Sequence, residues 1–195
     1  RRINSRQAGL GTFVSVPKVE AKLDTHLRQS FEEQMEGTGV HVDFELLSYE
    51  LVQAPEPIKA TMGIRGGRDV YRMERLRLVK GEIVGIEIRY ILNEYGTEIS
   101  AENLASKSAV AFMDETSAGP VDTVIVSVRA DAANPEIAAK LHMAKGAPLL
   151  IREHRFLDKA GRVILCGDAI YRGDAYRFSY SLRYDGLTPS NSPIP

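Results

Sequence analysis

The sequence predicts an α+β domain, in which a mainly antiparallel sheet has helices packed on it. Short runs of strand character follow one another with tight turns between them, most clearly around Lys80-Gly81 and at residues 158–161. Helical segments come between groups of strands and not after every strand, so a doubly wound parallel sheet is not expected. The 195 residues are enough for one good-sized core.

The composition is that of an ordinary globular domain, with 44% apolar and 26% charged residues and a net charge of −1. Because DNA-binding domains usually carry a basic excess, this balance argues against nucleic-acid binding by these residues alone. The one cysteine, Cys166, allows no internal disulfide, and no apolar stretch approaches the length of a membrane-spanning helix. We expect a cytoplasmic protein that does not contact a membrane.

The N-terminal part divides into three pieces. Residues 1–17 are polar and basic. Within them, the glycines of Gly9–Val14 are followed by β-branched and aromatic residues, which predicts a turn that leads into a strand. Residues 18–23 read as a linker. A helix is expected over residues 24–36, since apolar residues recur at every fourth position: Leu23, Leu27, Phe31 and Met35.

The middle of the chain holds the clearest hairpin. Its strands are residues 70–79 and 83–92, on either side of Lys80-Gly81. A strand at residues 42–52 and a short helix between Pro55 and Gly63 precede it. A single helix over residues 100–113, with Ser100 as its N-cap, follows.

The C-terminal third reads as a strand, a helix and a second hairpin. The expected strands cover residues 121–128, 148–157, 162–171 and 176–182, and a helix runs from Asn134-Pro135 to about His142. Residues 188–195 have loop composition and are expected to be a mobile tail.

Two arginines on the first hairpin strand are the main candidates for chemistry. With a period of two, Arg75 and Arg77 lie on one face. Their guanidinium groups repel each other unless an anion sits between them, acids oppose them or water screens them. A bound carboxylate or phosphate is the functional hypothesis, because guanidinium forks match those groups. A solvated strand face is the alternative.

The register of the hairpin decides whether an acid opposes them. A three-residue loop over residues 80–82 places Glu87 opposite Arg75, whereas a two-residue turn places it opposite Glu74, an unfavourable like-charge pair. The register with the three-residue loop is preferred, and a bulge at Gly85 would change which residues pair across the hairpin.

Other chemistry finds no support in the sequence. The four histidines share no metal-ligand spacing, and no G-x-S-x-G nucleophile elbow is present. The glycine-rich stretch at residues 63–68 lacks the Lys-Ser/Thr ending of a phosphate-binding loop. Cys166 lies in an apolar run, where a buried, inert thiol is expected. We therefore assign no metal, no cofactor and no catalytic residue.

Several fragments together resemble the UTRA effector domain of GntR-family transcription regulators, HutC type. Residues 9–14 resemble the end of a winged-helix wing, and Gln29-Ser30-Phe31 resembles a Ser-Phe entry to the first helix. Four further fragments resemble family stretches in the same order: Arg75-Leu76-Arg77 with Gly81, Glu87 and Tyr90; Ala138-Ala139-Lys140-Leu141; Pro148–Arg152; and Tyr171–Phe178.

The resemblance implies a chorismate-lyase-like fold, a homodimer and a ligand pocket beside the sheet. It implies residues 1–17 as a wing remnant and start of the linker, and 18–187 as the effector domain. Operator DNA would be bound only by a winged-helix domain that precedes this piece. The implied pocket residues are Ser30, Phe31, Arg75, Arg77, Glu87, Ser108 and Tyr171.

Two positions depart from sugar-phosphate-binding relatives. Val110 and Leu165 stand where those relatives often carry tyrosine and glutamate. An aromatic or aliphatic carboxylate is therefore a better candidate effector than an amino-sugar phosphate. The expected function is that of the effector-sensing domain of a bacterial transcription repressor, which binds a small anionic metabolite that modulates DNA binding of the full-length dimer. The alternative is a chorismate-lyase-type enzyme acting on a small aromatic carboxylate.

Overall fold

The fold is built on one six-stranded antiparallel sheet, which confirms the predicted class. The computed structural model describes residues 3–7, 11–15, 19–23, 35 and 39–180. Sheet order is β4-β5-β6-β9-β8-β7, with every neighbouring pair antiparallel. The strands are β4 (Val42–Gln53), β5 (Asp69–Val79), β6 (Glu82–Leu92), β7 (Thr123–Ala132), β8 (Pro148–Leu157) and β9 (Val163–Arg172).

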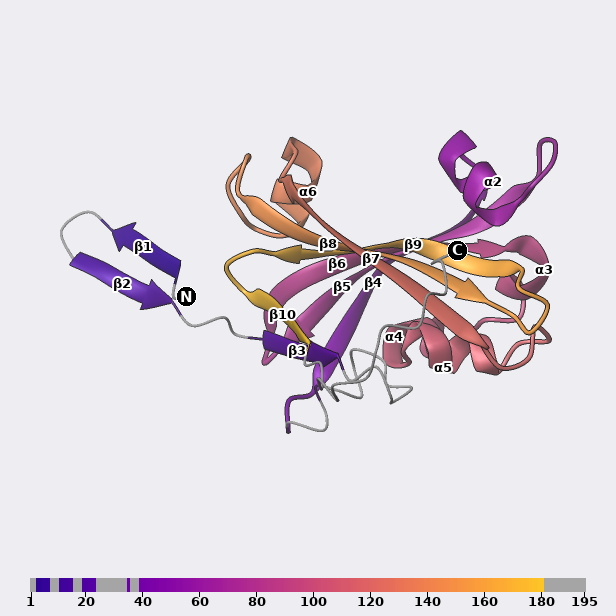
Figure 1. The fold of residues 1–195 in the computed structure, drawn as a ribbon, viewed down its shortest axis with the longest axis horizontal. Coiled ribbons are helices and arrows are strands. Elements are labelled where there is room, and N and C mark those ends of the chain that lie inside the picture. The colour runs from indigo at the N-terminus through magenta and orange to yellow at the C-terminus, as the bar shows by residue number, and fades with distance from the viewer. Residues whose placement is uncertain (1–2, 8–10, 16–18, 24–34, 36–38, 181–195) are drawn as a thin grey trace, which may run out of the picture.

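Short helices cover both faces of this sheet (Figure 1). Helices α2 (Glu56–Met62) and α6 (Pro135–Lys140) lie on one face, and α4 (Ala101–Ser106) and α5 (Ala109–Asp114) lie on the other. A one-turn helix, α3 (Asn93–Gly96), follows β6. No helix in the described part of the chain is long and apolar enough to cross a membrane.

Two small sheets complete the described structure. Strands β1 (Ile3–Gln7) and β2 (Gly11–Ser15) pair with each other, and β3 (Val19–Leu23) pairs in parallel with β10 (Tyr176–Tyr180). The linker prediction for residues 18–23 is therefore wrong, because most of that segment is strand β3. The predicted helix at 24–36, apart from buried Met35, and the tail at 188–195 lie outside the described residues.

Burial on the two faces follows the period of the strands. On the α6 face, Leu76 and Ile86 pack with Ile137 of the helix. On the opposite face, Met73 packs with Leu104 and with further residues of α4 and α5. The central strands of the sheet are therefore buried on both sides, and polar side chains that lie on them are in a largely apolar setting.

The first hairpin has the predicted pairing but reaches it by another route. The connection is a two-residue turn, in which Lys80 (φ 54°) and Gly81 (φ 75°) both take the left-handed conformation of a type I′ turn. A register shift after Arg77 leaves Val84 as an extra residue beside Gly85, and Arg75 then pairs with Glu87. The prediction of a three-residue loop was wrong, whereas the predicted pairing of Arg75 with Glu87 is confirmed.

The predicted helix over residues 100–113 is two helices. Ser100 caps α4 by accepting the Asn103 amide at 3.1 Å, as expected. The chain then turns extended at Lys107, and Ser108 begins α5 by accepting the Ala111 amide at 3.1 Å. A second serine that favours capping thus divides the apolar stretch. In addition, β7 begins two residues later and ends four residues later than predicted.

Candidate functional site

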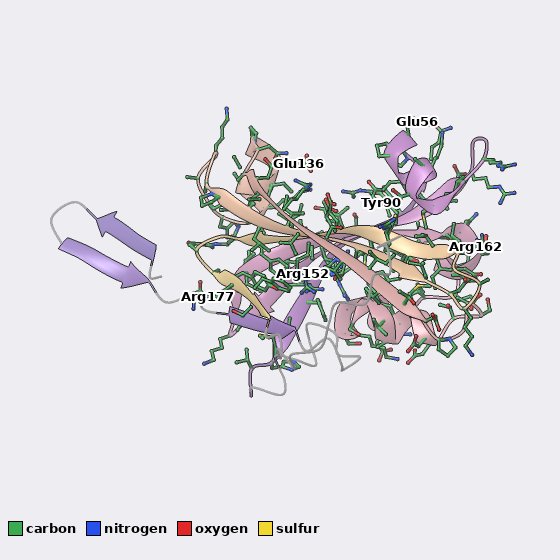
Figure 2. All side chains as sticks on the ribbon, viewed as in Figure 1. Glu56, Tyr90, Glu136, Arg152, Arg162 and Arg177 are labelled. Atoms are coloured by element: carbon green, nitrogen blue, oxygen red, sulfur yellow. The ribbon has the colours of Figure 1, made fainter. Side chains whose placement is uncertain are left out.

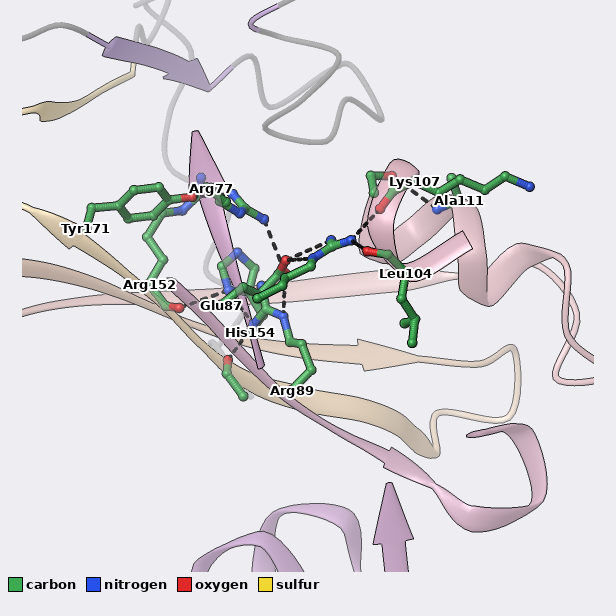
Figure 3. A network of polar contacts seen from close by, with 12 residues as sticks. Arg77, Glu87, Arg89, Leu104, Lys107, Ala111, Arg152, His154 and Tyr171 are labelled. Carbon is green, nitrogen blue, oxygen red and sulfur yellow. Dashed lines mark hydrogen bonds and ion pairs between the residues drawn. The ribbon is translucent and has the colours of Figure 1, made fainter. Parts of the chain in front are cut away.

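The candidate site is a cluster of arginines around one buried carboxylate, on the sheet face that α4 and α5 cover (Figure 3). Strand β5 contributes Arg75 and Arg77, and β6 contributes Glu87 and Arg89, because residues two apart on a strand share a face. Three of these four side chains are 0–1% exposed, and Arg77 is 4% exposed.

Glu87 binds three guanidinium groups at once. Its Oε2 accepts Arg75 Nε at 2.8 Å, and its Oε1 accepts Arg89 Nε at 2.7 Å and lies 3.2 Å from Arg77 Nη2. Burial by itself raises the pKa of this carboxyl, but the three cations outweigh burial and hold its pKa well below its usual range. Glu87 is therefore ionised throughout the neutral range.

Arg75 also joins the sheet to the break between α4 and α5. Its Nη1 donates to the carbonyls of Leu104 and, at 2.8 Å, Lys107, which end α4. Its guanidinium carbon lies 3.7 Å from the centre of the Phe44 ring. A cation at a helix C-terminus is favourable, since the last carbonyls carry partial negative charge.

Tyr171 of β9 closes one side of the cluster. Its hydroxyl accepts a hydrogen bond from Arg77, and its ring stacks on Tyr176 with centroids 3.8 Å apart. Gly85, the partner of Tyr171 in the sheet, makes this position possible, because a Cβ there would lie 2.9 Å from the Tyr171 ring.

Strand β8 brings two further polar side chains to the same face, Arg152 and His154. His154 Nδ1 lies 2.9 Å from the Arg152 carbonyl and 3.3 Å from Arg89 Nη1. Since a carbonyl can only accept, the shorter contact favours a neutral ring with the proton on Nδ1. Burial and the neighbouring Arg89 and Arg152 cations lower the pKa of His154 well below its usual value.

Arg152 has donor capacity left over. It is 5% exposed, donates from Nη1 to the Tyr176 hydroxyl at 3.3 Å, and its buried Nε has no hydrogen-bond partner within the described structure. A buried donor without a partner is costly, so this atom marks a place where an acceptor would be stabilising.

The structure brings together four of the predicted pocket residues: Arg75, Arg77, Glu87 and Tyr171. Ser108 lies one residue beyond the Lys107 carbonyl that Arg75 contacts and is 9% exposed. Ser30 and Phe31 lie outside the described residues. The two departures, Val110 and Leu165, both pack in the apolar cluster next to the site.

Sequence reasoning missed Arg89, Arg152 and His154 as members of the cluster. Arg89 follows Glu87 by two residues, so the period of the strand could have placed it on the same face. Arg152 and His154 oppose Ala169 and Gly167 in the predicted β8–β9 hairpin, and the decisive fact is the pairing of β9 with β6, which brings this hairpin next to Glu87 and Arg89. Local sequence carries no signal for the β6–β9 pairing.

A surface hollow of about 570 Å³ lies elsewhere, between α2 and the β8–β9 turn, and is lined by Gly63, Arg65, Arg68, Glu94 and Arg162 among others. Figure 2 shows Arg162 at that end of the molecule and Arg152 in the middle of the sheet. Arg162 is 2.7 Å from Glu94 and both are exposed, so this hollow lacks the buried charges of the arginine cluster. Within the described part of the chain, no group of His, Cys, Asp and Glu could hold a metal ion.

Comparison with protein families identifies the domain. The model of the UTRA domain matches residues 37–177, which covers the sheet and every described side chain of the cluster.

The chain belongs to the UTRA domain family.

Curated relatives of this UTRA domain are transcription regulators. The chain is 29% identical over 173 residues to the HTH-type transcriptional repressor NagR of Bacillus subtilis, covering 89% of this chain and 70% of NagR. It is 26% identical over 182 residues to the HTH-type transcriptional regulator Rv0792c of Mycobacterium tuberculosis, covering 91% of this chain and 65% of that protein. The chain thus spans about two thirds of the length of these relatives.

The solved structures share the fold. PhnF from Mycobacterium smegmatis superposes with a TM-score of 0.72 at 19% identity, covering 92% of this chain and 78% of PhnF. The family and its relatives therefore support an effector-binding domain of a GntR-type regulator, and they do not favour the chorismate-lyase-type enzyme.

Proposed function

We propose that this UTRA domain senses a small anionic metabolite and thereby modulates DNA binding by a homodimeric, HutC-type regulator in the cytoplasm. Residues 18–187 would form the sensor, residues 1–17 the end of a wing and the start of a linker, and residues 188–195 a mobile tail. The antiparallel pairing of β1 with β2 and the family match over residues 37–177 support this division.

One observation carries the proposal of an anion. Four guanidinium groups converge on one sheet face, and Glu87 is the only carboxylate that the described residues place among them. Arg152 makes no ion pair within the described structure, and its Nε is a buried donor without a partner. A carboxylate or phosphate would supply acceptors of the right charge and geometry.

The surroundings favour a largely apolar anion. Phe44 lies over Arg75, the stacked Tyr171 and Tyr176 rings lie next to Arg77, and Leu165 and Val110 pack close by. Apolar walls around a few polar groups are the usual make-up of small-molecule sites. We therefore favour an aromatic or aliphatic carboxylate over a sugar phosphate.

Mass spectrometry of small molecules released from the purified domain is the direct test. Thermal shift with benzoate, phenylacetate, hexanoate, inorganic phosphate and glucosamine 6-phosphate compares the two ligand classes. An effector at about 100 times its Kd stabilises the domain by roughly 2.7 kcal/mol. A released ligand that is neutral or cationic would refute an anion sensor.

The position of the site is tested with three variants. We expect Arg77→Ala to remove most of the ligand-induced shift, since a charge-assisted hydrogen bond contributes about 1.5–3 kcal/mol. Arg129→Ala is the control, because Arg129 lies on exposed β7 and pairs with Glu153. If Arg75→Ala and Arg77→Ala both respond to the ligand as the wild type does, the site lies elsewhere.

A further inference from the structure

The four arginines of the cluster differ in how their donors are used. In Arg75, Nε donates to Glu87 Oε2 at 2.8 Å and Nη2 lies 2.8 Å from the same oxygen, so its Nε–Nη2 edge faces Glu87. In Arg89, Nε donates to Glu87 Oε1 at 2.7 Å and Nη1 donates to the Gly167 carbonyl at 2.7 Å. Arg77 Nη2 lies 3.2 Å from Glu87 Oε1. One internal carboxylate therefore serves all three of these arginines.

Arg152 is the exception. Its Nη1 donates to the Tyr176 hydroxyl at 3.3 Å, and this is the one side-chain hydrogen bond that it makes within the described structure. Its buried Nε has no hydrogen-bond partner there, and its Nη2 makes no hydrogen bond or ion pair with a described residue. Because Nε–H and Nη2–H of an arginine point in parallel, this edge can bind a carboxylate through two hydrogen bonds.

The order of the sheet keeps Arg152 away from Glu87. Arg75, Glu87, Ala169 and Arg152 form one row across β5, β6, β9 and β8. Adjacent strands lie about 4.8 Å apart, so the backbones of Glu87 and Arg152 are separated by roughly 10 Å. The cross-strand neighbours of Arg152 are Ala169 and Val128, which carry no acceptor. The row thus places a buried cation where neither neighbouring strand supplies an acid.

Aromatic side chains surround the Arg152 guanidinium. Its central carbon lies 5.2 Å from the centre of the Phe178 ring, and Figure 3 shows the side chain directed toward Tyr171. Burial raises the pKa of Tyr176, and the neighbouring Arg152 and Arg77 cations partly offset this effect, which places both charges near the Tyr176 hydroxyl. A carboxylate bound to Arg152 is therefore also close to the charge of Arg77.

We propose that Arg152 binds the carboxylate of the effector through its Nε–Nη2 edge, and that Arg75 is a positioning residue that does not contact the effector. This inference rests on the anion sensing of the proposed function and says which arginine the anion meets. A buried charge without a counter-charge is unfavourable, so a carboxylate at this edge compensates the Arg152 cation and gives Nε its missing acceptor.

Calorimetric titration of residues 1–195 with benzoate, phenylacetate and hexanoate tests the assignment. Arg152→Met keeps a long side chain without charge and should weaken carboxylate binding at least about tenfold, since it removes a charge-assisted fork. Arg152→Lys keeps the charge without the fork and should recover only part of the affinity. Arg155→Met is the matched control on the exposed face of β8 and should bind as the wild type does.

The melting temperature of the empty domain separates ligand binding from a structural role. Arg152→Met removes a buried cation that has no ion pair with a described residue, so the empty variant should melt close to or above the wild type. A purely structural Arg152 predicts the reverse, which is a lower melting temperature and unchanged carboxylate affinity.

Proton–nitrogen NMR of the arginine Nε–H groups observes the contact directly. Adding the carboxylate that binds should shift an Nε–H signal that is absent from the spectrum of Arg152→Lys. The Nε–H signal of Arg75, identified with Arg75→Lys, should move little because that group already donates to Glu87. If Arg152→Met fails to fold, the spectra of the wild type and Arg152→Lys decide.

The outcomes separate this inference from the proposed function. If Arg152→Met and Arg152→Lys bind carboxylates as the wild type does, or if the shifted signal persists in Arg152→Lys, the inference is overturned while anion sensing stands. Failure of all three carboxylates to bind the wild type at about 10 mM, well above a millimolar Kd, also overturns it. A neutral or cationic molecule released from the purified domain refutes the anion sensor itself, even where NMR places an added carboxylate at Arg152.

Discussion

Glu87 holds three cations in place, although the burial of a carboxylate is itself unfavourable. A buried ion pair that loses one partner typically costs about 3–5 kcal/mol, because the remaining charges stay buried without compensation. We expect Glu87→Gln to lower the free energy of unfolding by that order, measured by urea denaturation.

Glu153→Gln is the matched control for this prediction. Glu153 also pairs with an arginine, at 2.7 Å from Arg129 Nε, but both side chains are more than 40% exposed. Exposed pairs contribute about 0–1 kcal/mol. Equal, small losses in the two variants would show that the charges around Glu87 are not desolvated as the structure describes.

His154 makes stability depend on pH in a known direction. Its folded pKa is lowered, first by burial and then by Arg89 and Arg152, whereas an unfolded histidine titrates near 6.5. Below about pH 6.5 the unfolded chain therefore binds more protons than the folded chain. The stability associated with neutral His154 is complete above that pH and is lost as the pH falls toward the folded pKa.

We expect the free energy of unfolding to fall between pH 7 and 5.5, with up to about 1.4 kcal/mol per pH unit from this one group. His154→Asn, which keeps a donor for the Arg152 carbonyl, should flatten the slope over this range. An unchanged slope in urea unfolding at stepped pH would mean that other groups dominate.

At the scale of elements, a comparison of two serine caps distinguishes an effect on stability from an effect on ligand sensing. Ser100 and Ser108 each accept a backbone amide at 3.1 Å, and loss of such a cap costs about 1 kcal/mol. We expect Ser100→Ala and Ser108→Ala to lower the melting temperature similarly. Only Ser108→Ala should also reduce the ligand-induced shift, because Ser108 adjoins the carbonyl that Arg75 contacts. Equal ligand responses would make Ser108 a cap alone.

Local patterns predicted most elements, and the errors have local causes. Strand β8 was predicted with its observed bounds, since alternation and flanking turns define it. The helix over residues 100–113 was predicted as one because its apolar spacing continues past Lys107, while the cap of Ser108 divides it. The hairpin register was correct because a bulge at Val84 offsets the shorter turn.

The part of the site that lies on the β5–β6 hairpin was predictable from the sequence. Arg75 and Glu87 are neighbours across β5 and β6, so strand period and charge were enough to pair them. Tyr171 came from the family resemblance. Arg152 and His154 enter the site through the order of β9 and β8 in the sheet, which depends on contacts distant in sequence.

At the scale of the whole molecule, we expect that residues 1–195 do not read an operator sequence. Their net charge is −1, and the family match over residues 37–177 is to a UTRA domain, whereas sequence readout needs an element such as a recognition helix in the major groove. We expect residues 1–195 to bind DNA at most weakly and without sequence preference in a mobility-shift assay, with a scrambled duplex as control. A shift specific to one sequence would contradict this.

The contacts of Arg75 bear on any attempt to turn this domain into a biosensor. One guanidinium satisfies Glu87, two carbonyls at the end of α4, and the face of Phe44. A library randomised at Arg75 would mostly yield destabilised clones, whatever their ligand preference. Retargeting should instead begin at Val110, a partly buried apolar side chain that packs against the neighbouring apolar core, because its replacement changes the shape there without removing a side-chain hydrogen bond.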